Sequence, residues 1–468
     1  MTVTADLIIS GGTVAAAAGV FSADVAVTEG VVTAIGHNHG PATDHIDATG
    51  RLVLPGGIDT HCHIEQLSGA GLLNADTFET ATRSAAFGGT TCTVSFAAQH
   101  PGMRLGRVMA DYAALAARGA LIDHAFHSIV ADTSGANLTD DLPALINAGH
   151  RSIKIFTTYD MVRLTDADIL ATMDVARAHG AMVCFHAEND AMIRRATAHL
   201  LAEGKTAPKY HAQSHPRAAE IEALGRICHF AELTGQPAML FHVSTTEGVD
   251  VIRAAKARGA PVWAETCPHY LFMTEDILDK SGNAGAAYLC SPPQRNAADQ
   301  EALWRGLSDG TIDLVTSDHA PYRMDESGKF AHGPDAAFNK LANGMPGLEV
   351  RLPLMFDAMV SQGRMGLSEF VRLTATTPAE VFGLAGKGRL EVGSDADIAL
   401  WNPSAEYTYR ANDLHDNVGY NPFDGTRVRG WPETVLSRGA VVVDQGQLHA
   451  RPGRGRRVVM QRSAAMLG

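Results

Sequence analysis

Two histidines that could bind a metal stand two residues apart at the end of an apolar segment. The stretch PGGIDTHCHIEQ covers residues 55–66 and contains His61 and His63. In a β-strand, residues i and i+2 point to the same face, so both imidazoles would converge while Cys62 faces away. Two converging imidazoles suit a divalent ion such as zinc. Taken alone the pair is weak evidence, because many histidine pairs are only hydrogen-bonded structural residues.

Further candidates occupy comparable places, each in or just after a short apolar segment. Lys154 lies in RSIKIF, His186 follows AMVCF, His242 follows PAMLF, and Asp318 follows IDLVTS. In a barrel of parallel strands, functional side chains gather where the strands end, at the carboxyl face. The pattern therefore predicts one metal site at a barrel mouth, made by His61, His63, Lys154, His186, His242 and Asp318.

Lys154 is the unusual member of this set. It is flanked by Ile153 and Ile155, so in a strand it faces away from both. A buried ammonium is costly and tends to lose its proton. A neutral amine can react with carbon dioxide to give a carbamate, an anionic ligand with two oxygens that could bridge two metal ions. The ordinary alternative is a surface lysine whose stem covers apolar neighbours, but the position argues against it.

The middle of the chain supplies the elements that would position these residues. Apolar, strand-like segments alternate there with helix-like segments such as 76–89, 165–180 and 247–260. Eight such units over roughly 330 residues predict an α/β fold, a (β/α)₈ TIM-type barrel. The longest insertion, residues 189–216, follows the fifth strand. The strand-like segments are 52–63, 90–97, 124–131, 152–158, 181–188, 237–245, 261–270 and 312–321.

The two ends of the chain have a different pattern. Short apolar runs broken by Gly and Asp occur in the first fifty residues and again near the C-terminus, as in a small antiparallel sheet. We predict one small β-domain from residues 1–54 plus 390–468, which include a C-terminal tail, and a catalytic barrel domain from residues 55–389.

Composition excludes several classes of partner. The chain has 468 residues, 46% hydrophobic and 19% charged, as soluble globular proteins do. A net charge of −13 disfavours nucleic acid or an anionic membrane as the main partner. No stretch approaches the ~18 apolar residues of a membrane span, and MTVTADLIISGG lacks the features of a signal peptide. Six scattered cysteines without a CxxC pair predict reduced core thiols in a cytoplasmic protein.

Taken together, these segments make the chain similar to a known family. It resembles the cyclic amidohydrolases, specifically the dihydropyrimidinase and D-hydantoinase branch. The resemblance covers nearly the whole chain and is carried by PGGIDTHCH, IKIFTTYD, FHAEN, FHVST, CPHYL, SPPQR, TSDHAPY and NGMPGLEVRLPL. It implies a barrel with a β-sandwich built from both chain ends, two divalent metal ions with zinc as the expected metal, and a homotetramer.

The resemblance also implies a role for each site residue. His61 and His63 would bind the more buried metal, and His186 and His242 the second. Lys154 would be the carboxylated bridging ligand. Asp318 would bind the first metal and shuttle protons. Tyr159 would donate a hydrogen bond to the oxyanion, while backbone groups of Ser291 and Asn343 would hold the amide and ureide edge of the substrate.

The implied reaction agrees with the chemistry of the residues. Hydrolysis of a cyclic amide needs a strong nucleophile at neutral pH, and metal binding lowers the pKa of water to about 7 in the best cases. A metal and the Tyr159 hydroxyl would stabilise the oxyanion. Asp318 would carry the proton from the attacking oxygen to the leaving nitrogen. A hydantoin or dihydropyrimidine would give an N-carbamoyl amino acid.

Two loops and several alternatives remain open. Dihydroorotases place an arginine just after the HxH pair, whereas this chain has IEQ, which disfavours an acidic ring. The loops LSGAGLLNAD and SFAAQHPG should line the pocket, with Leu67, Leu72 and Phe156 either forming its apolar part or packing within the loops. Allantoinase, another cyclic imide hydrolase, and a non-catalytic dihydropyrimidinase-like scaffold are the alternative functions, and the filled metal set argues against the scaffold. Side chains that either contact substrate or satisfy loop backbone are Glu65, Gln66, Gln99 and His100.

Overall fold

The centre of the molecule is a closed barrel of parallel strands. The computed structural model describes residues 4–37, 39–69 and 71–467. Within these ranges, eight parallel strands pair in chain order, and a parallel bridge between Cys62 and His319 connects the last to the first. The predicted (β/α)₈ barrel is thereby confirmed. Its strands are β8 (Gly57–Cys62), β9 (Thr90–Ala98), β10 (Asp123–Ile129), β11 (Ser152–Phe156), β12 (Met182–His186), β13 (Ala238–Leu240), β14 (Val262–Thr266) and β15 (Leu314–Val315).

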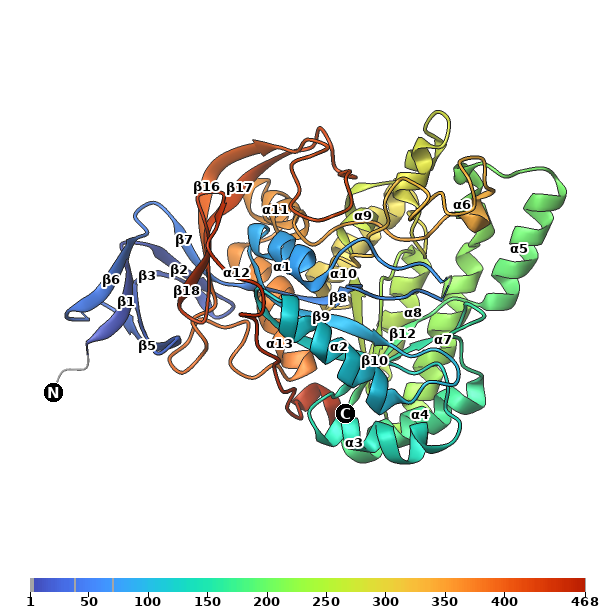
Figure 1. The fold of residues 1–468 in the computed structure, drawn as a ribbon, viewed down its shortest axis with the longest axis horizontal. Coiled ribbons are helices and arrows are strands. Elements are labelled where there is room, and N and C mark those ends of the chain that lie inside the picture. The colour runs from blue at the N-terminus through green and yellow to red at the C-terminus, as the bar shows by residue number, and fades with distance from the viewer. Residues whose placement is uncertain (1–3, 38, 70, 468) are drawn as a thin grey trace.

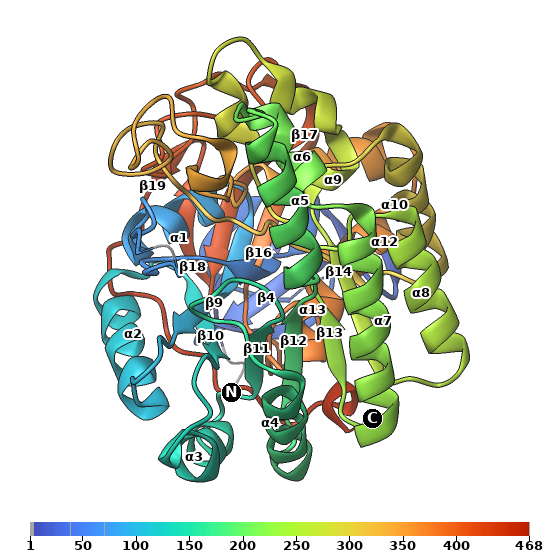
Figure 2. The ribbon, with the colours of Figure 1, turned by 90° about the vertical axis from the view of Figure 1, so that its right-hand side faces the viewer.

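The barrel strands are apolar because helices cover their outer faces. Every residue of β9 is buried, for example, as expected for a parallel sheet with both faces covered. Figure 2 shows α2, α4, α7 and α8 standing around the strands. Outside the insertion, the helices of this part of the chain include α1 (Phe78–Phe87), α2 (Leu105–Gly119), α3 (Leu142–Asn147), α4 (Asp166–His179), α7 (Arg217–Thr234), α8 (Thr246–Ala257), α10 (Ala297–Asp309), α13 (Thr377–Phe382), and α11 (Arg351–Phe356) and α12 (Leu367–Val371), which contact strands of the terminal sheets.

The helix ends carry the expected local signals. Thr165 caps α4 by accepting a hydrogen bond from the Asp168 backbone, and Gly180 ends that helix with a φ of +71°. The insertion after the fifth strand contains α5 (Asp190–Ala202) and α6 (His211–Ser214). One predicted boundary is wrong, because the seventh strand stops at Thr266 and α9 (Pro268–Phe272) begins there. Proline cannot donate to a sheet but suits the first turn of a helix.

Strands from both chain ends form two further sheets. One contains β5 (Val31–Gly36), β4 (Asp24–Thr28), β1 (Ala5–Ser10) and β6 (Ala42–Asp47) in that order. The other has the order β19-β18-β17-β16-β7-β2-β3, and Figure 1 shows its blue N-terminal and red C-terminal strands side by side. Its strands are β2 (Thr13–Ala16), β3 (Gly19–Ser22), β7 (Leu52–Pro55), β16 (Ile398–Thr408), β17 (Arg427–Ser437), β18 (Ala440–Asp444) and β19 (Gln447–Leu448).

The two terminal sheets share an apolar core of their own. Val25 and Val27 of the first sheet and Val14 and Leu400 of the second belong to one buried cluster, separate from the barrel core. The arrangement is a β-sandwich in which most strand pairs are antiparallel, as expected, whereas β1 with β6 and β2 with β7 are parallel pairs that the sequence did not indicate. A division into domains at residues 54/55 and 389/390 remains our proposal.

A buried ion cluster connects this sandwich to the barrel. The Lys387 ammonium lies 2.6 Å from the Asp123 carboxylate at the start of β10, and 2.8 Å from each of Asp395 and Asp397 near β16. The carboxylates outweigh the effect of burial and raise the pKa of Lys387. The lysine thus balances part of the negative charge of these three carboxylates, and Arg438, 3.0 Å from Asp123, supplies a second positive charge. Among the described residues, no helix has both the length and the apolar character needed to cross a bilayer.

Candidate active site

A single cavity collects the residues that the sequence singled out. It has a volume of about 410 Å³ and opens where the barrel strands end. Its wall combines the predicted polar residues with the apolar side chains of Leu67 and Phe156. Leu72 is not among the described residues that line it. All nine predicted site residues line it, namely His61, His63, Lys154, Tyr159, His186, His242, Ser291, Asp318 and Asn343.

The first histidine pair converges on one carboxylate oxygen. His61 Nε2 lies 3.1 Å and His63 Nε2 lies 3.4 Å from Asp318 Oδ1. Cys62, between them, is fully buried on the other side of the strand, with its Sγ 3.6 Å from the Val94 carbonyl. Ligand atoms of the three residues lie within 4.8 Å of one another, a spacing that suits a metal ion. The alternation expected of a strand thus places both imidazoles together.

A polar side chain behind each of three histidines fixes its orientation. The Glu265 carboxylate accepts a hydrogen bond from His61 Nδ1, and Gln66 Oε1 accepts one from His63 Nδ1 at 2.6 Å. Glu188 Oε2 accepts from His186 Nε2 at 2.8 Å. Each contact occupies one ring nitrogen and leaves the lone pair of the other for a metal, as partners of metal-binding histidines generally do.

His242 and Lys154 complete the group. The His242 ring lies 4.5 Å from the His186 ring and 5.5 Å from the His61 ring, between centroids. Its Nδ1 is buried without a hydrogen-bond partner among the described residues, so it can serve a ligand. The Lys154 ammonium lies 4.0 Å from the centre of the Phe241 ring and is almost fully buried. Burial lowers the pKa of Lys154 to about 8.

The electrostatics of the cavity favour a positive charge. Burial opposes protonation of His61, but the carboxylates of Glu265 and Asp318 outweigh it and raise its pKa to about 9. Burial likewise opposes ionisation of Asp318, yet His61 and the neighbouring imidazoles hold its pKa well below the usual range. A cation is therefore stabilised where the three side chains meet. This donor set of imidazoles and carboxylate, with a buried amine beside it, fits divalent metal ions.

Three of the site residues have strained backbones. Tyr159, His242 and Asp318 adopt φ values of +73°, +43° and +46°. Residues other than glycine adopt this left-handed conformation at a cost on the order of 1–3 kcal/mol each. The surrounding contacts hold all three in it at one cavity, as is common where function constrains the backbone.

A second polar group lines the same cavity. Asn343 Nδ2 donates to Ser291 Oγ at 3.1 Å, and Asn343 Oδ1 is buried without a partner among the described residues. The Tyr159 ring lies 5.1 Å from the His186 ring. Burial, followed by the nearby Glu188 carboxylate, raises the pKa of Tyr159, so its phenol stays protonated and can donate. These residues supply donors and an acceptor for a polar ligand.

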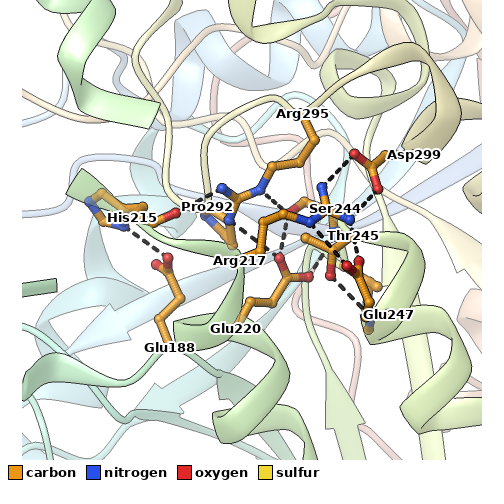
Figure 3. A network of polar contacts seen from close by, with 12 residues as sticks. Glu188, His215, Arg217, Glu220, Ser244, Thr245, Glu247, Pro292, Arg295 and Asp299 are labelled. Carbon is orange, nitrogen blue, oxygen red and sulfur yellow. Dashed lines mark hydrogen bonds and ion pairs between the residues drawn. The ribbon is translucent and has the colours of Figure 1, made fainter. Parts of the chain in front are cut away.

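A buried network extends outward from His186, and Figure 3 shows its members. Glu188 also accepts from His215 Nδ1 at 2.8 Å, and the His215 carbonyl accepts from Arg295 at 2.7 Å. The Arg295 guanidinium donates to Ser244 Oγ, two residues after His242, at 3.2 Å. Glu220 accepts from both the backbone and the hydroxyl of Ser244. The segments that carry His186 and His242 are therefore joined through hydrogen bonds.

At the far end of this network, Arg217 is bound by two carboxylates. Both oxygens of Asp299 accept from it at 2.7 Å, and Glu247 pairs with it from α8. Asp299 Oδ1 also accepts from the Thr246 backbone at 2.8 Å, at the start of α8. This end of the network contacts no predicted metal ligand.

The structure gives hydrogen-bond partners to the four side chains whose role the sequence did not decide. Glu65 accepts from the backbone of Phe78 at 3.0 Å, at the start of α1, and Gln99 accepts from the backbones of Ala131 and Asp132. Those two residues stabilise loops. Gln66 orients His63, and His100 lines the cavity while its Nε2 pairs with the carbonyl of Leu67 at 3.1 Å.

Two carboxylates that orient histidines were missed at the sequence level. The sequence could have indicated Glu188, because it stands two residues after His186, and the first histidine pair has the same spacing. Glu265 had only a weak one, a carboxylate within an apolar strand-like segment. Its partner His61 is 204 positions away, so only the closed barrel reveals the contact.

Comparisons with known proteins place nearly the whole chain in one family. A model of the amidohydrolase family matches residues 52–442. A D-hydantoinase of Rhizobium radiobacter is 40% identical over 452 residues, which are 96% of this chain and 98% of that protein. The crystal structure of a dihydropyrimidinase from Brevibacillus agri NCHU1002 has a TM-score of 0.94 and 38% identity, covering 98% and 99% of the two chains. An L-hydantoinase (dihydropyrimidinase) from Arthrobacter aurescens has a TM-score of 0.89 and 28% identity, covering 97% and 100%.

Proposed function

The chain belongs to the amidohydrolase family, and on that premise we propose that it hydrolyses the cyclic amide bond of hydantoins or dihydropyrimidines to give N-carbamoyl amino acids. The observation that carries this proposal is the cavity in which four imidazoles, one buried amine and one carboxylate meet. Such a donor set is what amide hydrolysis at neutral pH needs, because it can hold metal ions beside a substrate.

The residues divide into two metal positions. His61, His63 and Asp318 would hold one divalent ion, and His186 and His242 the other, with zinc as the expected metal. Two ions held there would supply an activated water and polarise the substrate carbonyl. Lys154 would bridge them as a carbamate, formed when its neutral amine attacks carbon dioxide and releases a proton. The aromatic ring of Phe241 against its ammonium supports this, since it keeps water away from the amine.

Two side chains would handle the proton and the oxyanion. Asp318 is held in its ionised form, so it can take the proton from the attacking oxygen and give it to the ring nitrogen as the C–N bond breaks. The Tyr159 phenol, kept protonated by burial, would donate to the carbonyl oxygen as negative charge develops there.

The rest of the cavity would select the substrate. Ser291 and Asn343 would bind the amide and ureide edge of the ring, and the free Asn343 Oδ1 offers an acceptor for a ring N–H. Leu67, Phe156 and Met161 provide an apolar region for an exocyclic substituent. None of the described residues that line the cavity is an arginine, which agrees with a substrate ring that carries no carboxylate.

We also propose a cytoplasmic homotetramer. All six cysteines are buried and unpaired, which suits a reducing compartment. The tetramer rests on the family resemblance, and sedimentation of the purified protein measures it directly.

A substrate panel on metal-replete protein tests the function. We expect the fastest turnover with 5-substituted hydantoins, supplied as separate enantiomers, or with dihydrouracil, and about two metal equivalents per chain by elemental analysis. Faster hydrolysis of allantoin or succinimide would replace the proposal with an allantoinase or another imide hydrolase. A protein with well under one metal equivalent and no turnover would instead be a scaffold.

A further inference from the structure

Lys329 is a fully buried lysine beside the cavity but outside the metal site. It lies in the loop between β15 and α11, and none of its surface is exposed. Its ammonium donates to the carbonyls of Ala342 and Gly344, each at 2.7 Å, and to that of Leu289 at 3.3 Å. The three N–H groups of the ammonium thus match three backbone acceptors.

These carbonyls belong to the two segments that carry the proposed substrate-binding residues. Leu289 lies two residues before Ser291, while Ala342 and Gly344 stand on either side of Asn343. The two segments also contact each other directly, because the Gly344 N–H donates to the Leu289 carbonyl at 2.8 Å. The Lys329 ammonium therefore lies where the two segments cross.

The burial of this lysine is not compensated by a counter-charge. Its hydrogen-bond partners are all carbonyl oxygens, and burial lowers the pKa of Lys329 to about 7. Lys387, by contrast, is buried among three carboxylates. A buried cation without a carboxylate partner lowers the stability of the fold. What Lys329 contributes is instead the backbone geometry that its hydrogen bonds enforce.

Each segment is also held by one contact that does not involve Lys329. The Cys290 carbonyl accepts from His211 Nε2 at 2.8 Å. Gly344 has a φ of +141°, and a Cβ added there would lie 2.3 Å from the Ala320 carbonyl oxygen. Close packing therefore restrains Gly344 on one side and the lysine on another, so loss of the ammonium should shift Asn343 relative to Ser291.

We propose that Lys329 is a positioning residue that fixes the distance between segments 289–291 and 342–344, and thereby the substrate-binding geometry of Ser291 and Asn343. It acts through these segments and does not touch the substrate. The inference rests on the proposed function for the roles of Ser291 and Asn343, whereas the contact itself can be tested without turnover.

The test compares Lys329→Met and Lys329→Gln with the wild type. Methionine keeps the apolar stem and removes all three donors, while glutamine retains two. For Lys329→Met we expect kcat/KM for the preferred substrate to fall about 10- to 100-fold, the scale of a small misplacement of binding groups. Most of the change should be in KM, with metal content unchanged and with faster hydrogen exchange of segments 289–291 and 342–344. Lys329→Gln should show smaller changes in the same direction.

Lys387→Met is the matched control, because it removes a buried lysine remote from the cavity. It should lower thermal stability and leave KM unchanged. Wild-type KM and exchange in Lys329→Met would overturn the proposal. A loss of metal in proportion to the rise in KM would also overturn it. The same holds if both Lys329 variants fail to fold while Lys387→Met folds. Either result would assign the lysine to general stability. Absent hydantoin turnover in the wild type would remove the proposed function, and the exchange comparison would still decide whether Lys329 orders the two segments.

Discussion

Replacing Glu188 by glutamine should weaken metal binding at His186 without disturbing the fold. Glu188 is fully buried, and its two oxygens accept from His186 Nε2 and His215 Nδ1, both at 2.8 Å. Figure 3 shows the contact with His215. Burial opposes its ionisation, but His215 and His186 hold its pKa well below the usual range, so it is an anion. Glu188→Gln keeps the shape and removes the charge.

The magnitude follows from the hydrogen bonds that glutamine can make. The amide has one acceptor oxygen and one donor nitrogen, so it satisfies only one of the two histidine donors. Either His215 changes its tautomer, or His186 accepts at Nε2 and carries its proton on Nδ1, the nitrogen that would bind the metal. In both cases His186 loses the anion behind it. Loss of such a partner typically lowers metal affinity 10- to 100-fold, or about 1.4–2.8 kcal/mol.

Competition with a chromophoric chelator measures this affinity, together with elemental analysis of the protein that remains. We expect one of the two metal equivalents to leave Glu188→Gln at a 10- to 100-fold lower chelator concentration than in the wild type. Asp299→Asn is the control, because it lies at the far end of the same network and contacts Arg217 and Thr246 but no ligand. Unchanged chelator resistance of Glu188→Gln, or an equal change in Asp299→Asn, would refute the reasoning.

Three further variants test other parts of the site and the fold. Lys154→Ala should lose metal and activity together, with partial rescue by acetate or propionate; full activity would show that the lysine is not a ligand. Tyr159→Phe should lower kcat by about 10²–10³ at constant metal content, whereas a change only in KM would indicate uniform binding. Burial, with a smaller contribution from Arg457, lowers the pKa of His150 from 6.5 to about 4. The unfolded chain therefore binds the additional proton, and stability falls with pH between these values, by about 2 kcal/mol at pH 5 for this group. In thermal melts of metal-free protein, His150→Gln should lose less stability than the wild type between pH 7 and pH 5, and equal losses would contradict the assignment.

The barrel could be predicted because its signals are local. Each strand is an apolar run buried on both faces, and each predicted ligand stands at or near the end of such a run, so position along the strand was enough to bring distant residues together. His61 and His63 illustrate this, since alternation alone placed both imidazoles in one cavity.

The features that escaped prediction depend on packing between distant segments. Nothing near Glu265 indicates that its carboxylate meets His61, and the apolar run that continues past Thr266 conceals the helix that begins at Pro268. The parallel pairing of β1 with β6 was equally hidden, because alternation of side chains does not report strand direction. Lys329 resembles any loop lysine in the sequence, and only the three-dimensional approach of two segments gives it acceptors.

The pairing of β7 with β16 has a consequence for the biosynthesis of this protein. Val53 pairs with Leu400, so at about 5–20 residues per second the ribosome needs roughly 20–70 s to deliver the partner strand. During that time β7 has an unpaired edge, and the apolar side chains of β2 and β7 lack the partners that β16 supplies, which makes this segment prone to aggregate. A nascent chain that stops before β16 leaves β7 without its neighbour, so a late truncation damages the first segment synthesised as well as the last.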